Sequence, residues 1–481
     1  MLLDKLSIRE VQNQVSTGKI HLSDVVSAFL TAIDSRKGLN AFLHVFAHES
    51  LQRADQIEAR LKAGTAGPLA GAIIAVKDNI ALKQQKLTCG SNILSEFISP
   101  YDATIIQKLH AADAIIIGKT NMDEFAMGSS SEHSAFSKVR NPHNTKCVPG
   151  GSSGGSAAAI AAHLCNGAIG SDTGGSIRQP AAFCGVYGLK PTYGRVSRFG
   201  LVAFASSLDQ IGPFANSVED LALLLQTLCG VDERDSTTAQ VAVPDADAAL
   251  AEIDLTGKVI GMPDEFFPDD LASDIAESIA TTRNAFEQRG ARVIEVSLPL
   301  TNYSMPTYYI ICTAEAASNL SRYDGAHFGY RAKDVRDLEE MYTKSRSEGF
   351  GDEVKRRIML GTFVQSAGYY DAYYKRAMRA RTLLRKEYEK VLQQCDFLLT
   401  PTTPTTAFQI GQKQDPLSMY LSDIFTVSAN LTGLPALSVP AGRDRNGLPI
   451  GVQLIGRAFD EASLLQAAKL LEDIQKNVSS T

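Results

Sequence analysis

The chain has 481 residues, enough for roughly three domains if each held about 150 residues. Hydrophobic residues make up 44% of it and charged residues 21%, so we expect a packed interior and exclude wholesale disorder. Lys and Arg number 47 against 53 Asp and Glu, a net charge of −6, which excludes a chain that holds a nucleic acid by its own positive charge.

The cysteines and the apolar runs indicate where the protein works. Seven cysteines are scattered along the chain without a Cys-x-x-Cys pair, which argues against a disulfide framework and for a reducing compartment. Residues 1–5 reach Asp4 and Lys5 before an apolar signal region could form, so we expect no secretory leader. The apolar runs, such as residues 221–225, are far shorter than the ~20 residues of a membrane span. We therefore expect a cytoplasmic protein that does not associate with a membrane.

The first half of the chain alternates helical and strand-like patterns. Residues 1–63 are predicted to form amphipathic helices, for example over 22–33 and 51–61, and residues 64–68 break this pattern. Short apolar runs then predict buried strands, with a helical segment between them. These elements are the strands 71–76 and 114–118 and the helix 104–112. Such alternation favours an α/β architecture.

The second half continues the same alternation. Ser217 and Asp220 have the spacing of a capping box ahead of a helix over residues 221–228, and Gly230 is placed to end it. Asn446-Gly447 is a hairpin signal between the last two strands. The remaining predicted elements are strands at 259–260, 293–296, 397–399, 436–439 and 451–455, a helix at about 270–288, and a charged, helix-rich segment at 331–390. Because no linker and no internal repeat divides the chain, we predict one large α/β domain with a helical insertion.

Two clusters of glycine and serine, residues 150–156 and 170–180, are the densest anomalies. Such clusters form flexible loops, and a glycine-rich loop that opens a helix can also bind phosphate. The Walker and dinucleotide-binding spacings are absent, which argues against a nucleotide site. Gly150 to Gly154 matches G-x-S-x-G, but the preceding residues 141–146 have turn composition, so the strand of an α/β-hydrolase elbow is missing.

Serine catalysis does not require a histidine, because a neutral lysine can serve as the base. Lys77 ends an apolar strand, where a lysine is usually a solvated surface residue. To act as a base it must be buried, so that its pKa falls from about 10.4 by something like 3 units. Lys77 and the two Gly/Ser clusters together make this interpretation worth testing.

Lys77, the Gly/Ser loop 150–156 and the segment 171–180 resemble the three elements of the amidase signature family, and their separations fit. The resemblance covers essentially the whole chain. It is closest to the A subunits of tRNA-dependent glutamine amidotransferases, which act on glutamyl-tRNA(Gln). The segments that carry this closer resemblance are 122–130, 188–213, 345–361 and 420–435.

The resemblance implies a fold and a division of the chain. We expect a central mixed β-sheet covered by helices on both faces, within a single amidase domain over residues 1–481. Its parts would be a helical segment 1–63, a catalytic core 71–230, a helix-rich part at about 265–395 that contributes to the glutamine pocket, and a C-terminal part 396–481 that completes the sheet.

The resemblance also implies a Ser-Ser-Lys triad. Ser176 would be the nucleophile that forms the acyl ester, Ser152 would relay its proton, and Lys77 would be the base. The peptide bond before Ser152 would be cis. The backbone amides of Thr173, Gly174, Gly175 and Ser176 would form the oxyanion hole, which explains the glycines there.

Glutamine offers an α-ammonium and an α-carboxylate for recognition. By resemblance, Asp423 would bind the ammonium and Arg356 the carboxylate, although Arg356 also belongs to a basic run, 355–357, of the kind that usually forms a solvated helix face. Ser129, and Tyr308 or Tyr309, would line the pocket. We expect no metal site, since His44 and His48 lack a third ligand.

The resemblance places the remaining chemistry on partners. A B subunit would bind the misacylated tRNA and use ATP and Mg²⁺, a small C subunit would complete a heterotrimer, and this chain would need no cofactor. The acceptor, Glu-tRNA(Gln), Asp-tRNA(Asn) or both, stays open. Two other interpretations also stay open: a stand-alone amidase that acts on small amides and needs neither Arg356 nor Asp423, and a non-catalytic scaffold subunit.

Overall fold

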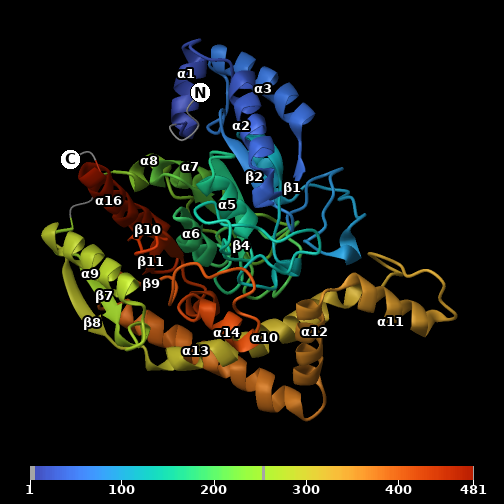
Figure 1. Cartoon of the computed structure of the whole chain (residues 1–481). Helices are drawn as coiled ribbons and strands as arrows, with labels where there is room; N and C mark the ends of the chain where they lie inside the picture. Colours follow the sequence, from blue (N-terminus) through green and yellow to red (C-terminus); the bar gives the residue numbers. More distant parts are fainter. Residues whose placement is uncertain (1–5, 252–254, 480–481) are drawn as a thin grey trace.

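A mixed eleven-stranded β-sheet runs through the computed structural model of the chain, which describes residues 6–251 and 255–479. Residues 1–5, on which the expectation of no secretory leader rests, lie outside the described residues. Helices surround the sheet, and α1–α3 lie together at one end of the molecule, at the top of Figure 1. The expected α/β architecture with a central mixed sheet is confirmed.

The strands are short, and most are fully buried. In chain order they are β1 Phe42–Val45, β2 Ile73–Lys77, β3 Ile115–Thr120, β4 Gly167–Asp172, β5 Tyr187–Lys190, β6 Gln210–Ala215, β7 Val259–Pro263, β8 Arg292–Val296, β9 Phe397–Pro401, β10 Ala436–Arg443 and β11 Pro449–Gly456.

The strand order across the sheet is β1-β3-β2-β4-β6-β5-β10-β11-β9-β7-β8. Strand β2 pairs in parallel with β3 and β4, β7 pairs in parallel with β8 and β9, and the other neighbours are antiparallel. The parallel trio β3-β2-β4 brings the carboxyl ends of β2 and β4 to one edge of the sheet. Lys77 ends the first of these strands and Asp172 ends the second.

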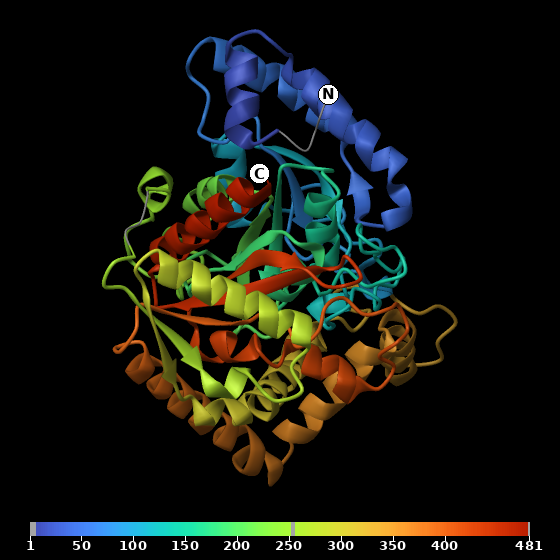
Figure 2. The same ribbon diagram turned by 60° about the vertical axis from the view of Figure 1, so that its left-hand side comes forward.

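Helices cover both faces of the sheet because side chains alternate along each strand. On β2, Ile74 and Val76 belong to one hydrophobic core, and Ile73 and Ala75 belong to another on the opposite face. Helices α7, α9 and α16 contribute to the first core, and α2 and α5 to the second. Figure 2 shows α9 and α16 lying across the sheet.

The helices vary in length from one turn to more than four turns. They are α1 Ile8–Ser16, α2 Leu22–Ser35, α3 Ala47–Lys62, α4 Thr104–Ala111, α5 Gly154–Ala161, α6 Arg178–Cys184, α7 Val218–Leu228, α8 Ala246–Ala249, α9 Ser273–Gln288, α10 Ser304–Asn319, α11 Leu338–Gly349, α12 Asp352–Gln365, α13 Lys375–Val391, α14 Pro416–Tyr420, α15 Val427–Thr432 and α16 Glu461–Ser479.

The expected elements lie close to these bounds. Ser217 caps α7 by accepting a hydrogen bond from the backbone N–H of Asp220, as the capping box predicts. The last two predicted strands form the antiparallel hairpin β10–β11. The expectation of helices alone over residues 1–63 was wrong at one point, since residues 42–45 form the edge strand β1 against β3.

All seven cysteines are buried and free. Within residues 6–251 and 255–479, no helix is both long and apolar enough to span a membrane. In the same described ranges, no group of three or more His, Cys, Asp or Glu side chains is arranged to hold a metal ion.

Candidate active site

Lys77 is the last residue of β2 and is completely buried. The alternation of the strand turns its side chain to the same face as Ile73 and Ala75, the face that packs against α5. Its Nζ lies 2.7 Å from Ser152 Oγ, 2.8 Å from Ser153 Oγ and 3.0 Å from Ser171 Oγ. The amine is therefore held among hydroxyl groups.

Burial lowers the pKa of Lys77 from its ordinary value of 10.5 to about 7. The carboxylates of Asp123, Asp172 and Asp209 oppose this shift because their charges favour the ammonium form. An amine with a pKa near neutrality is poised to accept a proton at physiological pH.

Ser152 and Ser153 precede the first residue of α5, and the peptide bond between Gly151 and Ser152 is cis. The backbone around this bond is held on both sides. Gly151 N–H donates to Gln179 Oε1 at 2.9 Å, and the Ser152 carbonyl accepts from the backbone N–H of Asp123 at 3.3 Å. The expected cis bond before the proposed relay serine is thus present.

Ser176 lies in the loop between β4 and α6, and Ser153 N–H donates to its carbonyl oxygen at 3.2 Å. This contact joins the two Gly/Ser segments that the sequence analysis singled out. Ser176 keeps 7% of its surface exposed, and its hydroxyl has no hydrogen-bond partner among the described residues. No other described side chain therefore holds this hydroxyl in place.

The loop 173–176 is anchored through its carbonyl groups. Thr426 Oγ1 donates to the Gly174 carbonyl at 2.6 Å, and the N–H of Gln179 donates to the Gly175 carbonyl at 2.8 Å. Within the described part of the chain, none of the backbone N–H groups of residues 173–176 has a hydrogen-bond partner. These donors are free to bind a developing negative charge.

Only glycine fits at two positions of this loop. Gly175 has φ +148°, and a Cβ there would lie 2.2 Å from Thr426 Oγ1. A Cβ on Gly174 would lie 2.6 Å from the ring of Tyr308. Both glycines therefore permit close approach between the loop and the residues opposite it.

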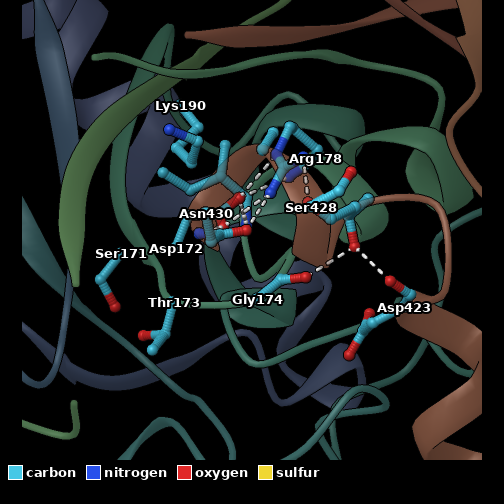
Figure 3. A network of polar contacts seen from close by, with 12 residues as sticks. Ser171, Asp172, Thr173, Gly174, Arg178, Lys190, Asp423, Ser428 and Asn430 are labelled. Atoms are coloured by element: carbon cyan, nitrogen blue, oxygen red, sulfur yellow. Dashed lines mark hydrogen bonds and ion pairs between the residues drawn. The ribbon is translucent and has the colours of Figure 1, made fainter. Parts of the chain in front are cut away.

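A buried ion pair lies next to this loop (Figure 3). Asp172 accepts bonds from Arg178 Nη2 at 3.0 Å and from the N–H of Ile177 at 3.0 Å. The guanidinium also donates to the Thr426 carbonyl at 2.9 Å and to Asn430 Oδ1 at 2.6 Å. The Arg178 charge holds the pKa of Asp172 low, at about 2, against the opposing effect of burial. The pair thus links the loop 173–176 to α15.

Asp423 lies close to the loop 173–176, since a Cβ on Gly175 would lie 3.2 Å from its Oδ1. Its Oδ2 accepts a hydrogen bond from Ser129 Oγ at 2.5 Å, while its Oδ1 is buried without a partner among the described residues. Burial raises the pKa of Asp423 to about 7, and the bond from Ser129 only partly offsets this. A buried carboxylate oxygen without a donor is a site for a cation.

Three tyrosines pack on one another beside the loop 173–176. Tyr308 lies directly against Gly174, and its ring packs edge-on against Tyr309 with centroids 5.1 Å apart. Tyr309 in turn stacks on Tyr420 at 4.1 Å. Of the two tyrosines that the sequence left open, Tyr308 lies against the loop and Tyr309 lies one ring further out.

Arg356 is linked through Glu353 to Tyr420, the last of these three tyrosines. Its side chain is 44% exposed and pairs with Glu353, whose other oxygen accepts a bond from Tyr420 Oη at 2.8 Å. The structure does not bring Arg356 into contact with Asp423. Its neighbour Arg357 is buried, lies 2.8 Å from Glu353 and faces the rings of Tyr309 and Tyr420.

Three residues around Lys77 were not predicted from the sequence. Ser153 and Ser171 contact its amine directly, and Asn79 donates to Ser171 Oγ at 2.9 Å. Ser153 and Ser171 stand inside the Gly/Ser clusters, but residue type alone does not distinguish them from their serine neighbours. Asn79 follows the strand end, where only the fold shows its contact.

The family model named Amidase matches residues 24–465 of the chain. The A subunit of glutamyl-tRNA(Gln) amidotransferase from Syntrophus aciditrophicus (strain SB) is 51% identical over 474 residues, which cover 98% of each chain. The protein of the same name from Persephonella marina is 51% identical over 471 residues and 97% of each chain.

Solved structures agree with this relationship. The crystal structure of the A subunit of glutamyl-tRNA(Gln) amidotransferase from Thermotoga maritima superposes with a TM-score of 0.81 at 41% identity, covering 98% of this chain and 95% of that one. The chain therefore belongs to the amidase family and, within it, to the glutamyl-tRNA(Gln) amidotransferase A subunits.

Proposed function

We propose that this chain is the glutaminase subunit of a tRNA-dependent amidotransferase. It hydrolyses glutamine and supplies the ammonia that converts Glu-tRNA(Gln) to Gln-tRNA(Gln) on a partner subunit. The observation that carries this proposal is the contact of 2.7 Å between Lys77 Nζ and Ser152 Oγ, with the Ser176 segment joined to the Ser152 segment by the bond from Ser153 N–H to the Ser176 carbonyl.

In the first step, Ser176 Oγ attacks the side-chain amide carbon of glutamine. Its proton passes to Ser152 Oγ, and the proton of Ser152 passes to the neutral amine of Lys77. The oxyanion that forms is bound by the free backbone N–H groups of residues 173–176. One such donor is typically worth about 10²–10³ in rate.

In the second step, the carbon–nitrogen bond breaks. The proton returns from Lys77 through Ser152 to the amide nitrogen, which leaves as ammonia, and a γ-glutamyl ester remains on Ser176. Water then attacks the ester and gives its proton along the same path, which releases glutamate and restores the hydroxyl of Ser176.

Glutamine is held by both of its charged groups. Asp423 Oδ1, which lacks a partner among the described residues, binds the α-ammonium, and Ser129 fixes the orientation of that carboxylate. Tyr308 closes the wall of the pocket. Arg356 binds the α-carboxylate, which requires its guanidinium to turn away from Glu353 toward the pocket.

The rest of the reaction belongs to partners. A B subunit binds the misacylated tRNA and activates its carboxylate with ATP and Mg²⁺, and a small C subunit completes the heterotrimer, so this chain needs no cofactor of its own. Seven free cysteines are compatible with a reducing compartment, and we place the complex in the cytoplasm.

The test uses the reconstituted complex with two nitrogen sources. With wild type, both glutamine and an ammonium salt should support formation of Gln-tRNA(Gln). With Ser176→Ala, glutamine should fail while ammonium should still serve, because the partner's chemistry is intact. Glutamine-dependent product from Ser176→Ala at the wild-type rate would refute the proposal. The same assay with Asp-tRNA(Asn) decides the acceptor.

A further inference from the structure

The amine of Lys77 has several possible hydrogen-bond partners, but it must keep one direction free to accept a proton. A neutral amine has two N–H donors and one lone pair. Three hydroxyl oxygens, those of Ser152, Ser153 and Ser171, lie within 3.0 Å of Nζ. If Ser152 is to give its proton to the lone pair, the other two hydroxyls must accept from the N–H groups.

The hydroxyl proton of Ser153 is already donated in another hydrogen bond. Ser153 Oγ donates to the backbone carbonyl of Ser171 at 3.0 Å, and it accepts weakly from the N–H of Ser171 at 3.3 Å. Its remaining lone pair therefore faces Lys77, and at 2.8 Å it accepts one N–H of the amine.

Asn79 directs the Ser171 hydroxyl in a similar way. Its Nδ2 donates to Ser171 Oγ at 2.9 Å, and its Oδ1 is buried without a partner among the described residues. Asn79 has an exposed fraction of only 2%, so water does not replace this bond. With one lone pair of Ser171 Oγ bound by Asn79, the other faces Lys77 at 3.0 Å.

We propose that Asn79, through Ser171, and Ser153 position the amine of Lys77 so that its lone pair points at Ser152. Both N–H groups are then occupied. The Ser171 carbonyl, at 3.4 Å from Nζ, has no proton to give, so the lone pair is left with the contact of 2.7 Å with Ser152 Oγ. Asn79 and Ser171 are positioning residues, because they act on the proton path through the lysine. This inference rests on the proposed function, in which Lys77 is the base.

The charges around the amine do not provide this orientation. The charged or titratable groups that act on Lys77 are Asp123, Asp172, Asp209 and Cys89. The three carboxylates are engaged elsewhere: Asp123 with the N–H groups of residues 131 and 133, Asp172 with Arg178, and Asp209 with Thr173. The groups that touch the amine are all neutral, so hydrogen bonds rather than an ion pair set its direction.

The test measures glutamine hydrolysis by the reconstituted complex from pH 5.5 to 9.5. Asn79→Asp replaces the amide with a carboxylate, which is separated from Lys77 Nζ only by the hydroxyl group of Ser171. We expect the rising limb of kcat to move to higher pH by about one unit, because a nearby negative charge favours the ammonium form. Activity should approach that of wild type at the alkaline end.

Asn79→Ala and Ser171→Ala provide the second measurement. Each removes the bond that fixes one N–H of the amine, and we expect kcat at the plateau pH to fall about tenfold while KM for glutamine stays within about twofold. A structural defect would instead lower the amount of assembled complex or raise KM. Thermal unfolding and gel filtration of each variant report assembly.

Asn166→Asp is the matched control. Asn166 is also a buried asparagine whose side chain bonds to backbone groups, those of Gly71 and Ile73, at the opposite end of β2 from Lys77. Its pH limb should coincide with that of wild type.

The inference is overturned if Asn79→Asp leaves the pH limb in place, or if Ser171→Ala and Asn79→Ala retain the wild-type kcat. If Asn79→Asp does not assemble, the two alanine variants decide by the same criterion of kcat against KM. Failure of the proposed function has a different signature, since wild type itself would then lack glutaminase activity that depends on Ser176.

Discussion

Lys77 Nζ and Ser152 Oγ lie 2.7 Å apart, although 75 positions of chain separate the two residues. The contact forms because β2 delivers the lysine to the carboxyl edge of the sheet and the turn before α5 delivers the serine to the same place. Both residues are completely buried, which keeps bulk water from competing for the proton.

Replacing Lys77 by Arg should abolish glutamine hydrolysis while retaining a long cationic side chain. A guanidinium with a pKa above about 12 cannot give up its proton to become a base. We expect kcat to fall by about 10²-fold or more, measured as glutamate release by the complex. Lys83→Arg, an exposed position beyond the end of the same strand, serves as the control and should match wild type. Comparable turnover by Lys77→Arg would remove this lysine from the mechanism.

The pH dependence should report two groups. The pKa values of Lys77 and Asp423 are both shifted to about 7, downward for the amine and upward for the carboxyl, and burial is the first cause in each case. Both groups must be deprotonated in the free enzyme before glutamine is bound and attacked, so kcat/KM should rise with pH through about 7. At pH values well below 7, kcat/KM should be inversely proportional to the square of the proton concentration.

Asp423→Asn separates these two contributions. The amide cannot ionise, so the acid limb of kcat/KM should become first order in protons, and KM for glutamine should rise because the α-ammonium loses its counter-charge. Rates measured at glutamine concentrations far below KM give this limb directly. A variant that kept the second-order limb would show that another group titrates there.

Arg356→Ala should raise KM for glutamine by about tenfold to a hundredfold, the usual cost of losing a charge-assisted hydrogen bond. The plateau kcat should change less, since the proposed role is binding. Lys355→Ala is a close control, because that side chain is the adjacent cation on α12 and pairs with Asp352 at the surface. If only the control raised KM, or if neither did, the carboxylate would have to bind elsewhere in the pocket.

Gly175→Ala should lower kcat by about 10²–10³, because a Cβ would push the loop away from Thr426 and displace the oxyanion donors. The matched control is Gly442→Ala, which also changes a glycine of positive φ but has no heavy atom within 4 Å of the added carbon. That variant should keep its glutaminase rate and lose only a little stability. Equal activity of the two variants would contradict the assigned position of the oxyanion hole.

Long periodic segments and apolar strands of the fold were predictable from the sequence, and irregular or weakly patterned ones were not. The apolar run that ends at Lys77 predicts β2 because such runs suit a buried parallel strand. Strand β1 is only four residues long and lies at the sheet edge between two helices, and an apolar run this short does not distinguish a strand from a helix. Glycines at 167 and 170 in β4 likewise weaken the strand pattern there.

The sequence allowed the catalytic residues to be named but did not allow the contacts among them to be predicted. The spaced triad residues could be named from the resemblance, but which serine touches the amine depends on the turn before α5 and on β4. Arg356 and Arg357 are neighbours in sequence that point about 100° apart on a helix, so only the packing of α12 shows that one is half-exposed and the other buried.

The assignment of Ser176 as the nucleophile is tested by the intact mass of this chain when the complex is quenched in acid during turnover on glutamine. We expect one γ-glutamyl group on wild type, mapped by peptide digestion to Ser176, and none on Ser176→Ala or Lys77→Arg. An acyl group on any other residue, or rapid glutamine turnover by a protein that cannot be acylated at position 176, would contradict it.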